Sequence, residues 1–177
     1  MKAVIVYKSK TGFTKKYAQV IAKEIAGDLL ELKKATPKKL EGYDTVVFGS
    51  RFFAGTVDGM KKARELFAAS GAEKLVVFAT GATPNAAEEI INEVWKNNFT
   101  PEELETIPHF YMQSGICYEK MPFGEKMMMK MAAKMMKNQK EKDEMGQGFE
   151  EALKGSFDIS SEEYVKPLVE YLKSGNM

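Results

Sequence analysis

The chain has very few of the residues that build disulfides and metal sites: among 177 residues there are one cysteine, one histidine and one tryptophan. A single Cys cannot form an internal disulfide, and one Cys with one His cannot supply an all-Cys/His zinc site. An excess of charge is lacking too, since 26 basic and 25 acidic residues leave a net charge of +1. This balance gives no electrostatic argument for nucleic acid as a partner.

Long apolar runs are also missing. No stretch approaches the roughly 20 apolar residues of a membrane span. The apolar run near the N-terminus, 3–7, is too short for a signal peptide and leads into a polar loop. These features predict a cytoplasmic protein. Hydrophobic residues make up 44% of the chain, which is typical of a folded globular protein, and the length predicts one domain over 1–177.

Apolar runs alternate with segments of helical periodicity from the N-terminus onward. The pattern predicts strands at 3–7, 29–32, 45–48, 75–79 and 110–112, and helices at 14–26, 58–69, 85–96 and 161–172. Asp58 and Ser160 or Ser161 are expected N-caps. This alternation predicts an α/β fold in which crossover helices join the strands of a doubly wound parallel sheet. Ligands bind such sheets beyond the carboxyl ends of the strands, so the loops after the first, third and fourth strands are candidates.

The loop after the first strand is rich in hydroxyl groups. It reads Ser9-Lys10-Thr11-Gly12-Phe13-Thr14, and its hydroxyls, its glycine and the backbone N–H groups at a helix start suit a phosphate. The spacing matches neither G-x-G-x-x-G nor G-x-x-x-x-G-K-[ST], which argues against a dinucleotide fingerprint and a Walker-type NTPase. A cradle for one terminal phosphate and an ordinary loop in which Thr14 only caps the helix both remain open.

Two motifs resemble the flavodoxin-like family of FMN-binding proteins. The loop 9–14 is similar to that family's FMN-phosphate loop. The run Leu40-x-x-Tyr43-Asp44-Thr45-Val46-Val47-Phe48-Gly49-Ser50 is similar to its third strand and the start of its first flavin-flanking loop. The resemblance covers 1–116 and the last helix. It implies a flavodoxin-like sheet of five parallel strands in the order 2-1-3-4-5.

The resemblance also implies FMN as the cofactor, and a set of residues that bind it. Ser9, Thr11, Gly12 and Thr14 would hold the phosphate, and Lys10 and Phe13 would contribute backbone N–H groups. One face of the isoalloxazine would be flanked by Ser50, Arg51, Phe52, Phe53, Ala54 and Gly55. The other would be lined by Thr80, Gly81, Ala82 and Thr83. Because this second segment offers no aromatic ring, one flavin face would stay open to a substrate.

The chain is more similar to the flavodoxin-like protoporphyrinogen IX dehydrogenases, bacterial FMN enzymes that pass electrons to quinones, than to the acidic flavodoxin carriers. Gly49-Ser50-Arg51-Phe52 and a long segment after the fifth strand carry this likeness. It implies an oxidoreductase of porphyrin biosynthesis that oxidises a porphyrinogen with a quinone as acceptor. Arg51 beside the flavin would raise the flavin's reduction potential; the alternative is that Arg51 points to solvent or pairs with Asp58. An electron carrier between partner proteins, and an interaction module without flavin, are the alternatives.

The segment between the fifth strand and the last helix is too long for a simple connection. It predicts an inserted Met/Lys-rich helical segment at about 117–158, with a helix at 123–137 after Pro122. One arc of this helix carries Lys126, Lys130, Lys134 and Lys137, and the opposite arc carries Met127, Met128, Met131, Ala132, Met135 and Met136. Such a helix fits peripheral contact with a membrane, a porphyrin or quinone pocket wall, a partner groove, or packing on its own domain.

Four further features are predicted to be structural. Cys117 is expected to be an inert thiol, since no neighbour in sequence argues for a lowered pKa. His109 is expected to have a structural or surface role, and Trp95 to lie in the core. The acidic residues of 102–105 are expected to open a short helix, where carboxylates complement the N-terminal dipole.

Overall fold

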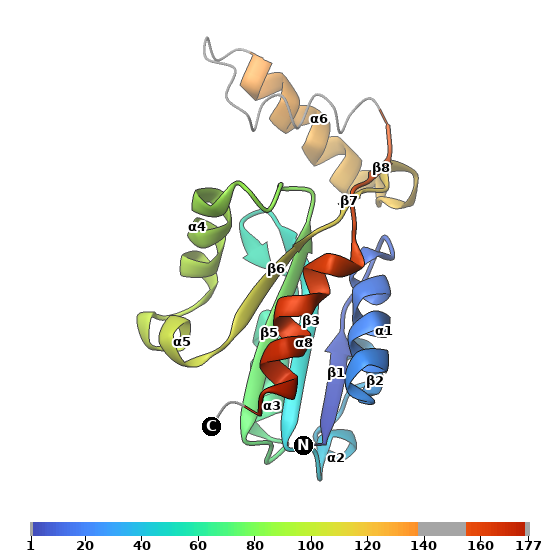
Figure 1. Ribbon diagram of the computed structural model, residues 1–177. Helices are drawn as coiled ribbons and strands as arrows, with labels where there is room; N and C mark the ends of the chain where they lie inside the picture. The colour runs from blue at the N-terminus through green and yellow to red at the C-terminus, as the bar shows by residue number, and fades with distance from the viewer. Residues whose placement is uncertain (1, 138–154, 176–177) are drawn as a thin grey trace.

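Five parallel strands form the central sheet of the computed structural model, which describes residues 2–137 and 155–175 (Figure 1). The strands lie in the order β2-β1-β3-β5-β6. Their bounds are β1 Ala3–Tyr7, β2 Asp28–Glu31, β3 Thr45–Phe53, β5 Lys74–Gly81 and β6 His109–Gln113. The predicted α/β fold and the order 2-1-3-4-5 are therefore confirmed, since β5 and β6 are the fourth and fifth parallel strands along the chain.

Helices cover both faces of this sheet (Figure 1). They are α1 Phe13–Ile25, α2 Pro37–Leu40, α3 Met60–Ala68, α4 Glu88–Asn98, α5 Pro101–Thr106 and α8 Lys166–Lys173, with 3-10 turns at Leu32–Lys34 and Glu162–Val165. The buried side chains of α1 and α8 pack on one face and those of α3 and α4 on the other. Along β1, Val4 and Val6 therefore face the α3–α4 layer and Ile5 faces the α1–α8 layer. Burial on both faces explains the continuous apolar runs.

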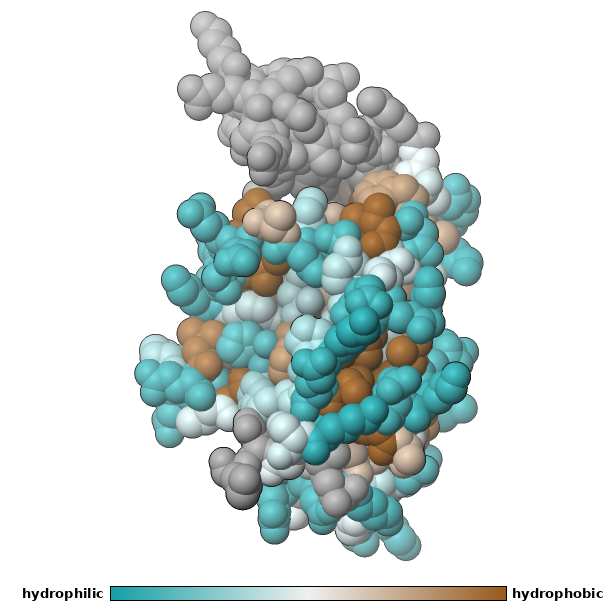
Figure 2. Space-filling view, in the orientation of Figure 1, coloured by the Kyte–Doolittle hydropathy of each residue, from teal (hydrophilic) through white to brown (hydrophobic). Residues whose placement is uncertain are grey.

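The layer formed by α1 and α8 has a shallow groove on its outer side. Val20, Val165 and Val169 lie in this groove of about 360 Å³ among charged residues of both helices. Figure 2 shows the same region as apolar surface between rows of hydrophilic side chains.

Two strands run further than the sequence predicts. Arg51 to Phe53 and Thr80 to Gly81 were predicted to be loop residues, but they continue β3 and β5. The reason is a hairpin, because strand β4 (Thr56–Val57) folds back on the end of β3 through a turn at Ala54 and Gly55, both with positive φ. Pairing of Arg51 with Thr80 then extends β5 alongside.

The predicted caps are partly wrong. Gly59, not Asp58, is the N-cap of α3. Gly12 is the N-cap of α1, so the alternative in which Thr14 only caps this helix is excluded. The Asp58 carboxylate pairs instead with Lys8, at 2.6 Å from its Nζ. Helix α4 begins at Glu88 rather than at residue 85, because the chain before it is held to β6 by hydrogen bonds between residues 85 and 113.

Other local predictions are confirmed. The Ser161 side chain accepts a hydrogen bond from the backbone N–H of Glu163 and caps the turn before α8. Thr100 and Glu103 form a capping box at the start of α5, the short helix opened by the acidic residues. Trp95 is buried in the core.

The segment after β6 forms a small two-stranded sheet and a helix. Strand β7 (Gly115–Ile116) pairs with β8 (Phe157–Asp158), and between them lie a 3-10 turn at Tyr118–Lys120 and helix α6 at Phe123–Lys137. The predicted helix at 123–137 is confirmed. Figure 1 shows α6 beyond the carboxyl ends of the parallel strands, extending away from the sheet. The rest of the predicted insertion, 138–154, lies outside the described residues, and the division into one domain stays a prediction.

Within 2–137 and 155–175, the structure has no helix that is both long enough and apolar enough to span a membrane.

Gly49 in β3 tests how tightly this sheet is packed near its carboxyl edge. A Cβ at Gly49 would lie 2.0 Å from Cζ of Phe78, whose ring is itself fully buried. Gly49→Ala is therefore expected to lower the free energy of unfolding by about 1–3 kcal/mol, measured by urea denaturation. Gly124→Ala in α6 is the control, because a Cβ there meets no atom within 4 Å. Equal midpoints for Gly49→Ala and the wild type would contradict this packing.

Candidate functional site

The three segments that the sequence predicts to bind the cofactor meet at the carboxyl ends of β1, β3 and β5. The loop 9–14 follows β1, residues 50–55 end β3 and form its hairpin turn, and residues 80–83 end β5. The hydroxyls of Thr14 and Thr80 lie 2.9 Å apart and join the first segment to the third. Arg51 and Thr80 are paired in the sheet and join the second to the third. The roles of these residues in binding stay predictions.

The start of α1 fits a phosphate group. Its N-cap, Gly12, has φ 109°, which a residue with a Cβ adopts only under strain. Among the described residues, no side chain caps this helix end and no acidic residue lies in its first turn. The first-turn N–H groups therefore lack acceptors within the helix, and they favour an anion through both hydrogen bonding and the helix dipole.

The hydroxyls of the loop are not equivalent. Ser9 and Thr11 are partly exposed, and the Ser9 Oγ accepts a hydrogen bond from the backbone N–H of Gly12 at 3.2 Å. Thr14 is buried and its hydroxyl is bonded to Thr80. Ser9 and Thr11 are therefore the more accessible hydroxyls for a ligand, while Thr14 ties the loop to β5.

The two aromatic rings at the end of β3, Phe52 and Phe53, lie in different surroundings. The Phe52 ring stacks on Tyr111 at 5.1 Å between centroids and meets Trp95 edge-on at 4.9 Å. The Phe53 ring lies under the Arg51 guanidinium, with 4.3 Å from its centroid to Cζ. Phe52 thus belongs to the core on the α4 side, and Phe53 packs with the charged residues of the site. The Ser50 hydroxyl donates to the backbone oxygen of Asp58.

The end of β5 is fixed by its neighbour β6. The backbone oxygen of Gly81 accepts hydrogen bonds from the N–H of Ser114 at 2.7 Å and from its hydroxyl at 3.1 Å. The Tyr111 hydroxyl donates to the backbone oxygen of Thr83 at 2.8 Å, and burial raises the pKa of Tyr111, so that it remains a donor. Ala82 and Thr83 are partly exposed. This segment therefore lines the site with backbone and small side chains.

A carboxylate that the sequence reasoning missed lies at the centre of these segments. Glu125, in the first turn of α6, accepts two hydrogen bonds from Arg51, from Nη1 to Oε2 at 2.8 Å and from Nη2 to Oε1 at 2.7 Å. The Lys10 Nζ donates to the same Oε1 at 2.7 Å. The hydrogen bonds from Arg51, aided by the one from Lys10, outweigh burial and lower the pKa of Glu125 to about 2. This carboxylate is therefore ionised at neutral pH.

Glu125 belongs to a charge cluster of five residues: Lys8, Lys10, Arg51, Asp58 and Glu125. Besides its pair with Lys8, the Asp58 carboxylate lies 3.7 Å from the Arg51 Nε. Arg51 therefore faces two carboxylates. These two anions reduce the positive potential that Arg51 would present to a neighbouring group, and the expected effect of Arg51 on a flavin stays a prediction.

One feature of the sequence distinguishes Glu125 from its neighbours. It is the only acidic residue of the segment 123–137, which has four lysines. In the structure Glu125 and Met129, one helical turn apart, are the buried side chains of α6 among those that the structure describes.

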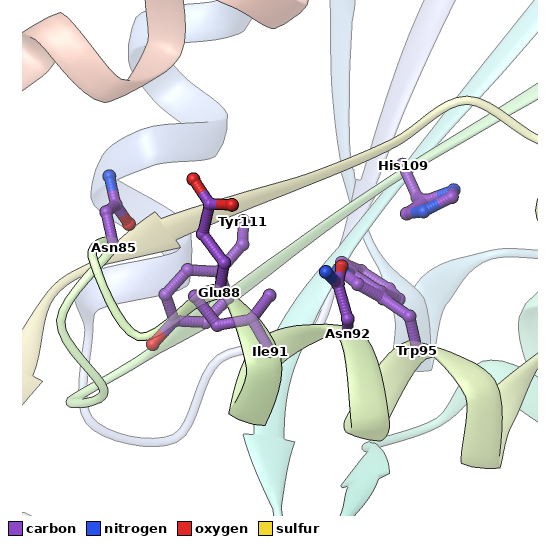
Figure 3. Close-up of a pocket in the computed structure, with 7 residues that line it drawn as sticks. All are labelled: Asn85, Glu88, Ile91, Asn92, Trp95, His109 and Tyr111. Carbon is purple, nitrogen blue, oxygen red and sulfur yellow. The ribbon is translucent and has the colours of Figure 1, made fainter.

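A separate cavity of about 250 Å³ lies between α4 and β6, outside the nominated segments (Figure 3). Trp95 and Asn92 from α4 and His109 and Tyr111 from β6 are among its lining residues. His109 donates from Nδ1 to the Ile107 oxygen at 2.8 Å and packs against Trp95 at 5.0 Å between centroids. Within the described ranges, no group of three or more His, Cys, Asp or Glu side chains could hold a metal ion.

A doubly wound parallel sheet with a hydroxyl-rich loop after its first strand defines a class of α/β proteins that bind ligands at the carboxyl edge. The family model described as "Flavodoxin domain" matches residues 4–143 of the chain. The chain belongs to this flavodoxin domain family.

Several solved structures are similar to the chain. A flavodoxin from the domain Archaea is 21% identical, with 64% of this chain and 85% of that chain covered and a TM-score of 0.43. Oxidised flavodoxin 2 from Bacillus cereus is 19% identical, with 64% and 84% covered and a TM-score of 0.41. A flavoprotein in complex with FMN from Lactobacillus acidophilus is 19% identical, with 63% and 91% covered and a TM-score of 0.40. No curated protein matches the chain.

The charge of Glu125 is expected to contribute to stability in a pH-dependent manner. Because folding lowers its pKa from 4.5 to about 2, the contribution is present above pH 4.5 and is lost as the pH falls toward 2. A shift of this size corresponds to about 3 kcal/mol at neutral pH. Urea denaturation of the wild type and of Glu125→Gln from pH 7 down to pH 3 should therefore give a difference in unfolding free energy that narrows below pH 4.5.

Glu24→Gln is the matched control, because Glu24 forms an exposed pair with Lys173 at 3.1 Å. Exposed pairs contribute only about 0–1 kcal/mol. A difference for Glu125→Gln that is as small as that for Glu24→Gln, or that stays constant with pH, would contradict the role of the Glu125 charge.

Proposed function

We propose that this protein is an FMN-dependent oxidoreductase whose cofactor lies at the carboxyl edge of the sheet. The observation that carries the proposal is the uncapped start of α1 behind Gly12, in a hydroxyl-rich loop, in a chain of the flavodoxin domain family. FMN, when bound, supplies the transfer of one or two electrons. The chain supplies the grip on the phosphate, the orientation of the ring and the local charges.

The residues divide these tasks between them. Ser9 and Thr11 donate hydroxyl hydrogen bonds to the phosphate, and the backbone N–H groups of Lys10 and Phe13 add to them, with Gly12 shaping the turn. Thr14 holds the loop against Thr80. The segment 50–55, where Phe53 is the ring on the side of the charge cluster, would flank one face of the isoalloxazine. The segment 80–83 would flank the other, and its small residues would leave room for a substrate.

The first experiment asks whether the protein binds FMN. Purified protein is expected to be yellow and to release FMN on denaturation, or to bind added FMN with a loss of flavin fluorescence. Riboflavin, which lacks the phosphate, is expected to bind more weakly. A protein that is colourless and binds neither compound would overturn the proposal and favour the interaction module without flavin.

The phosphate loop is tested by Ser9→Ala and Thr11→Ala. Each removes a hydrogen bond to a charged group, worth about 1.5–3 kcal/mol, or about 10- to 100-fold in the dissociation constant of FMN. The affinity for riboflavin should stay unchanged. Thr106→Ala in α5 is the control, because its hydroxyl only donates to the backbone oxygen of Glu102. Parallel losses for FMN and riboflavin would show that the loop does not bind the phosphate.

Within this function we propose a porphyrinogen-type substrate and a quinone acceptor. The likeness of the segment 49–52 and of the long insertion to the protoporphyrinogen dehydrogenases supports this choice, and so does the absence of an aromatic ring in the segment 80–83. An electron carrier between partner proteins is the alternative. Protoporphyrinogen oxidation with menaquinone and without a partner protein tests the enzyme. Lack of turnover, with fast electron exchange with a ferredoxin reductase, would favour the carrier.

We also propose that α6 makes peripheral contact with an anionic membrane surface. The sequence left open whether its methionines pack on the domain, and four apolar side chains of the helix are exposed: Phe123 79%, Met127 47%, Met128 52% and Met131 61%. Exposed Lys130 and Lys134 lie on the same helix. Apolar side chains with lysines beside them are typical of helices that lie in a membrane interface.

Charge reversal at Lys126, Lys130 and Lys134 tests the membrane contact. Because each lysine contributes about 1 kcal/mol near anionic lipid, the triple change to Glu is expected to abolish cosedimentation with phosphatidylserine vesicles. The control changes Lys61, Lys62 and Lys96 to Glu, which alters the net charge equally on exposed residues of α3 and α4. A wild-type protein that does not bind the vesicles, or a control that loses as much binding, would contradict the proposal.

A further inference from the structure

Two cations from different elements converge on one carboxylate at the candidate site. Lys10 belongs to the loop after β1 and Arg51 to β3, and both donate to Glu125 with donor–acceptor distances of 2.7 to 2.8 Å. A guanidinium that donates two parallel hydrogen bonds, with an ammonium on the same oxygen, is a complete recognition site for a carboxylate. Lys10 and Arg51 could make the same charge-assisted hydrogen bonds to a carboxylate of a bound ligand as they make to the carboxylate of Glu125.

The position of the Arg51 guanidinium is fixed by residues of the sheet and its loops and not by α6. The Arg51 side chain is 15% exposed, it lies on the Phe53 ring, and its Nε is near the Asp58 carboxylate. Asp58 is in turn held by Lys8. The guanidinium is therefore positioned before any carboxylate binds, and such preorganisation lowers the entropic cost of binding a ligand.

The anionic half of the contact is contributed by α6, a helix most of whose described side chains are exposed. Among the described side chains of α6, Glu125 and Met129 are buried, whereas Phe123, Met127 and Met131 are exposed. Figure 1 shows the helix extending away from the strand ends. The Glu125 carboxylate joins this first turn to the loop after β1 and to β3, and another carboxylate would make the same hydrogen bonds to Lys10 and Arg51.

We propose that Lys10 and Arg51 bind a carboxylate group of the substrate, and that Glu125 occupies their site until the substrate displaces it. The inference rests on the proposed function, since it is the nearby flavin that makes a ligand here a substrate. It adds the substrate class: a compound that carries at least one carboxylate. The exchange replaces one set of charge-assisted hydrogen bonds by another, and its net cost is the release of the first turn of α6.

Calorimetric titration with benzoate tests the site, with neutral benzamide as the control ligand. Glu125→Gln removes the internal competitor, so benzoate is expected to bind this variant at least tenfold more tightly than the wild type. Adding Arg51→Gln to it should abolish the gain. Glu24→Gln, which removes an equal charge at a distant exposed pair, should bind benzoate as the wild type does. Equal benzoate affinities for the wild type and Glu125→Gln would overturn the proposal, as would a gain for inorganic phosphate but not for benzoate.

Hydrogen exchange of the wild type gives a second measurement, which needs no variant. Saturating benzoate is expected to speed amide exchange in residues 123–131 and to leave α4 unchanged. Benzoate that binds without this change would also overturn the proposal. If Glu125→Gln does not fold, Glu125→Asp retains the charge on a shorter side chain and should give a smaller gain in benzoate affinity, and no gain would contradict the proposal.

The titrations are run on the protein as purified, with and without added FMN. A protein that binds no flavin fails the proposed function, yet the benzoate gain of Glu125→Gln still tests the carboxylate site. A protein that binds FMN but shows no benzoate gain fails this inference alone.

Discussion

Burial of the parallel sheet on both faces is the constraint on which the rest of this structure depends. The α1–α8 layer covers one side and the α3–α4 layer covers the other, so that Val47, Phe48 and Val76 in the central strands are completely buried. No ligand can reach the faces of such a sheet. The carboxyl edge, where the strands end and the chain turns back, is where loops and helix ends can hold one.

The packing at the carboxyl edge decides which side chains of a strand end face the core and which face the candidate site. Side chains alternate across β3, so Phe52 joins Trp95 and Tyr111 on one face while Arg51 and Phe53 lie on the other. The hairpin with β4 keeps this alternation regular as far as residue 53. One aromatic ring is therefore used for the core, and the next becomes a platform for a cation.

The sequence predicts the fold well because its signals are local. Runs such as 45–48 and 75–79 read as strands buried on both faces, and the helices between them have clear periodicity. The same local reasoning failed for the N-cap of α3, because Gly59 occupies a position of positive φ that no side chain marks. It failed for the end of β3 because that strand is lengthened by pairing with β4, a strand of only two residues.

The charge cluster could not be predicted for a different reason. Glu125 is 115 residues from Lys10 and 74 from Arg51 along the chain, and the contact exists only because an inserted helix returns to the edge of the sheet. Periodicity indicates which side of α6 is cationic, but it does not indicate which residue meets the rest of the molecule. A single acid among four lysines was the only local sign.

The cluster also limits what the site can do electrostatically. Lys8, Lys10 and Arg51 face Asp58 and Glu125, so the cations exceed the anions by one. If a substrate carboxylate replaced that of Glu125, the number of anions held by Lys10 and Arg51 would not change. The potential at a neighbouring cofactor would then be similar with the helix in place and with the substrate bound. Under the proposed exchange, one carboxylate would replace another and the site would open without a change in its charge, which a neutral side chain at position 125 would not allow.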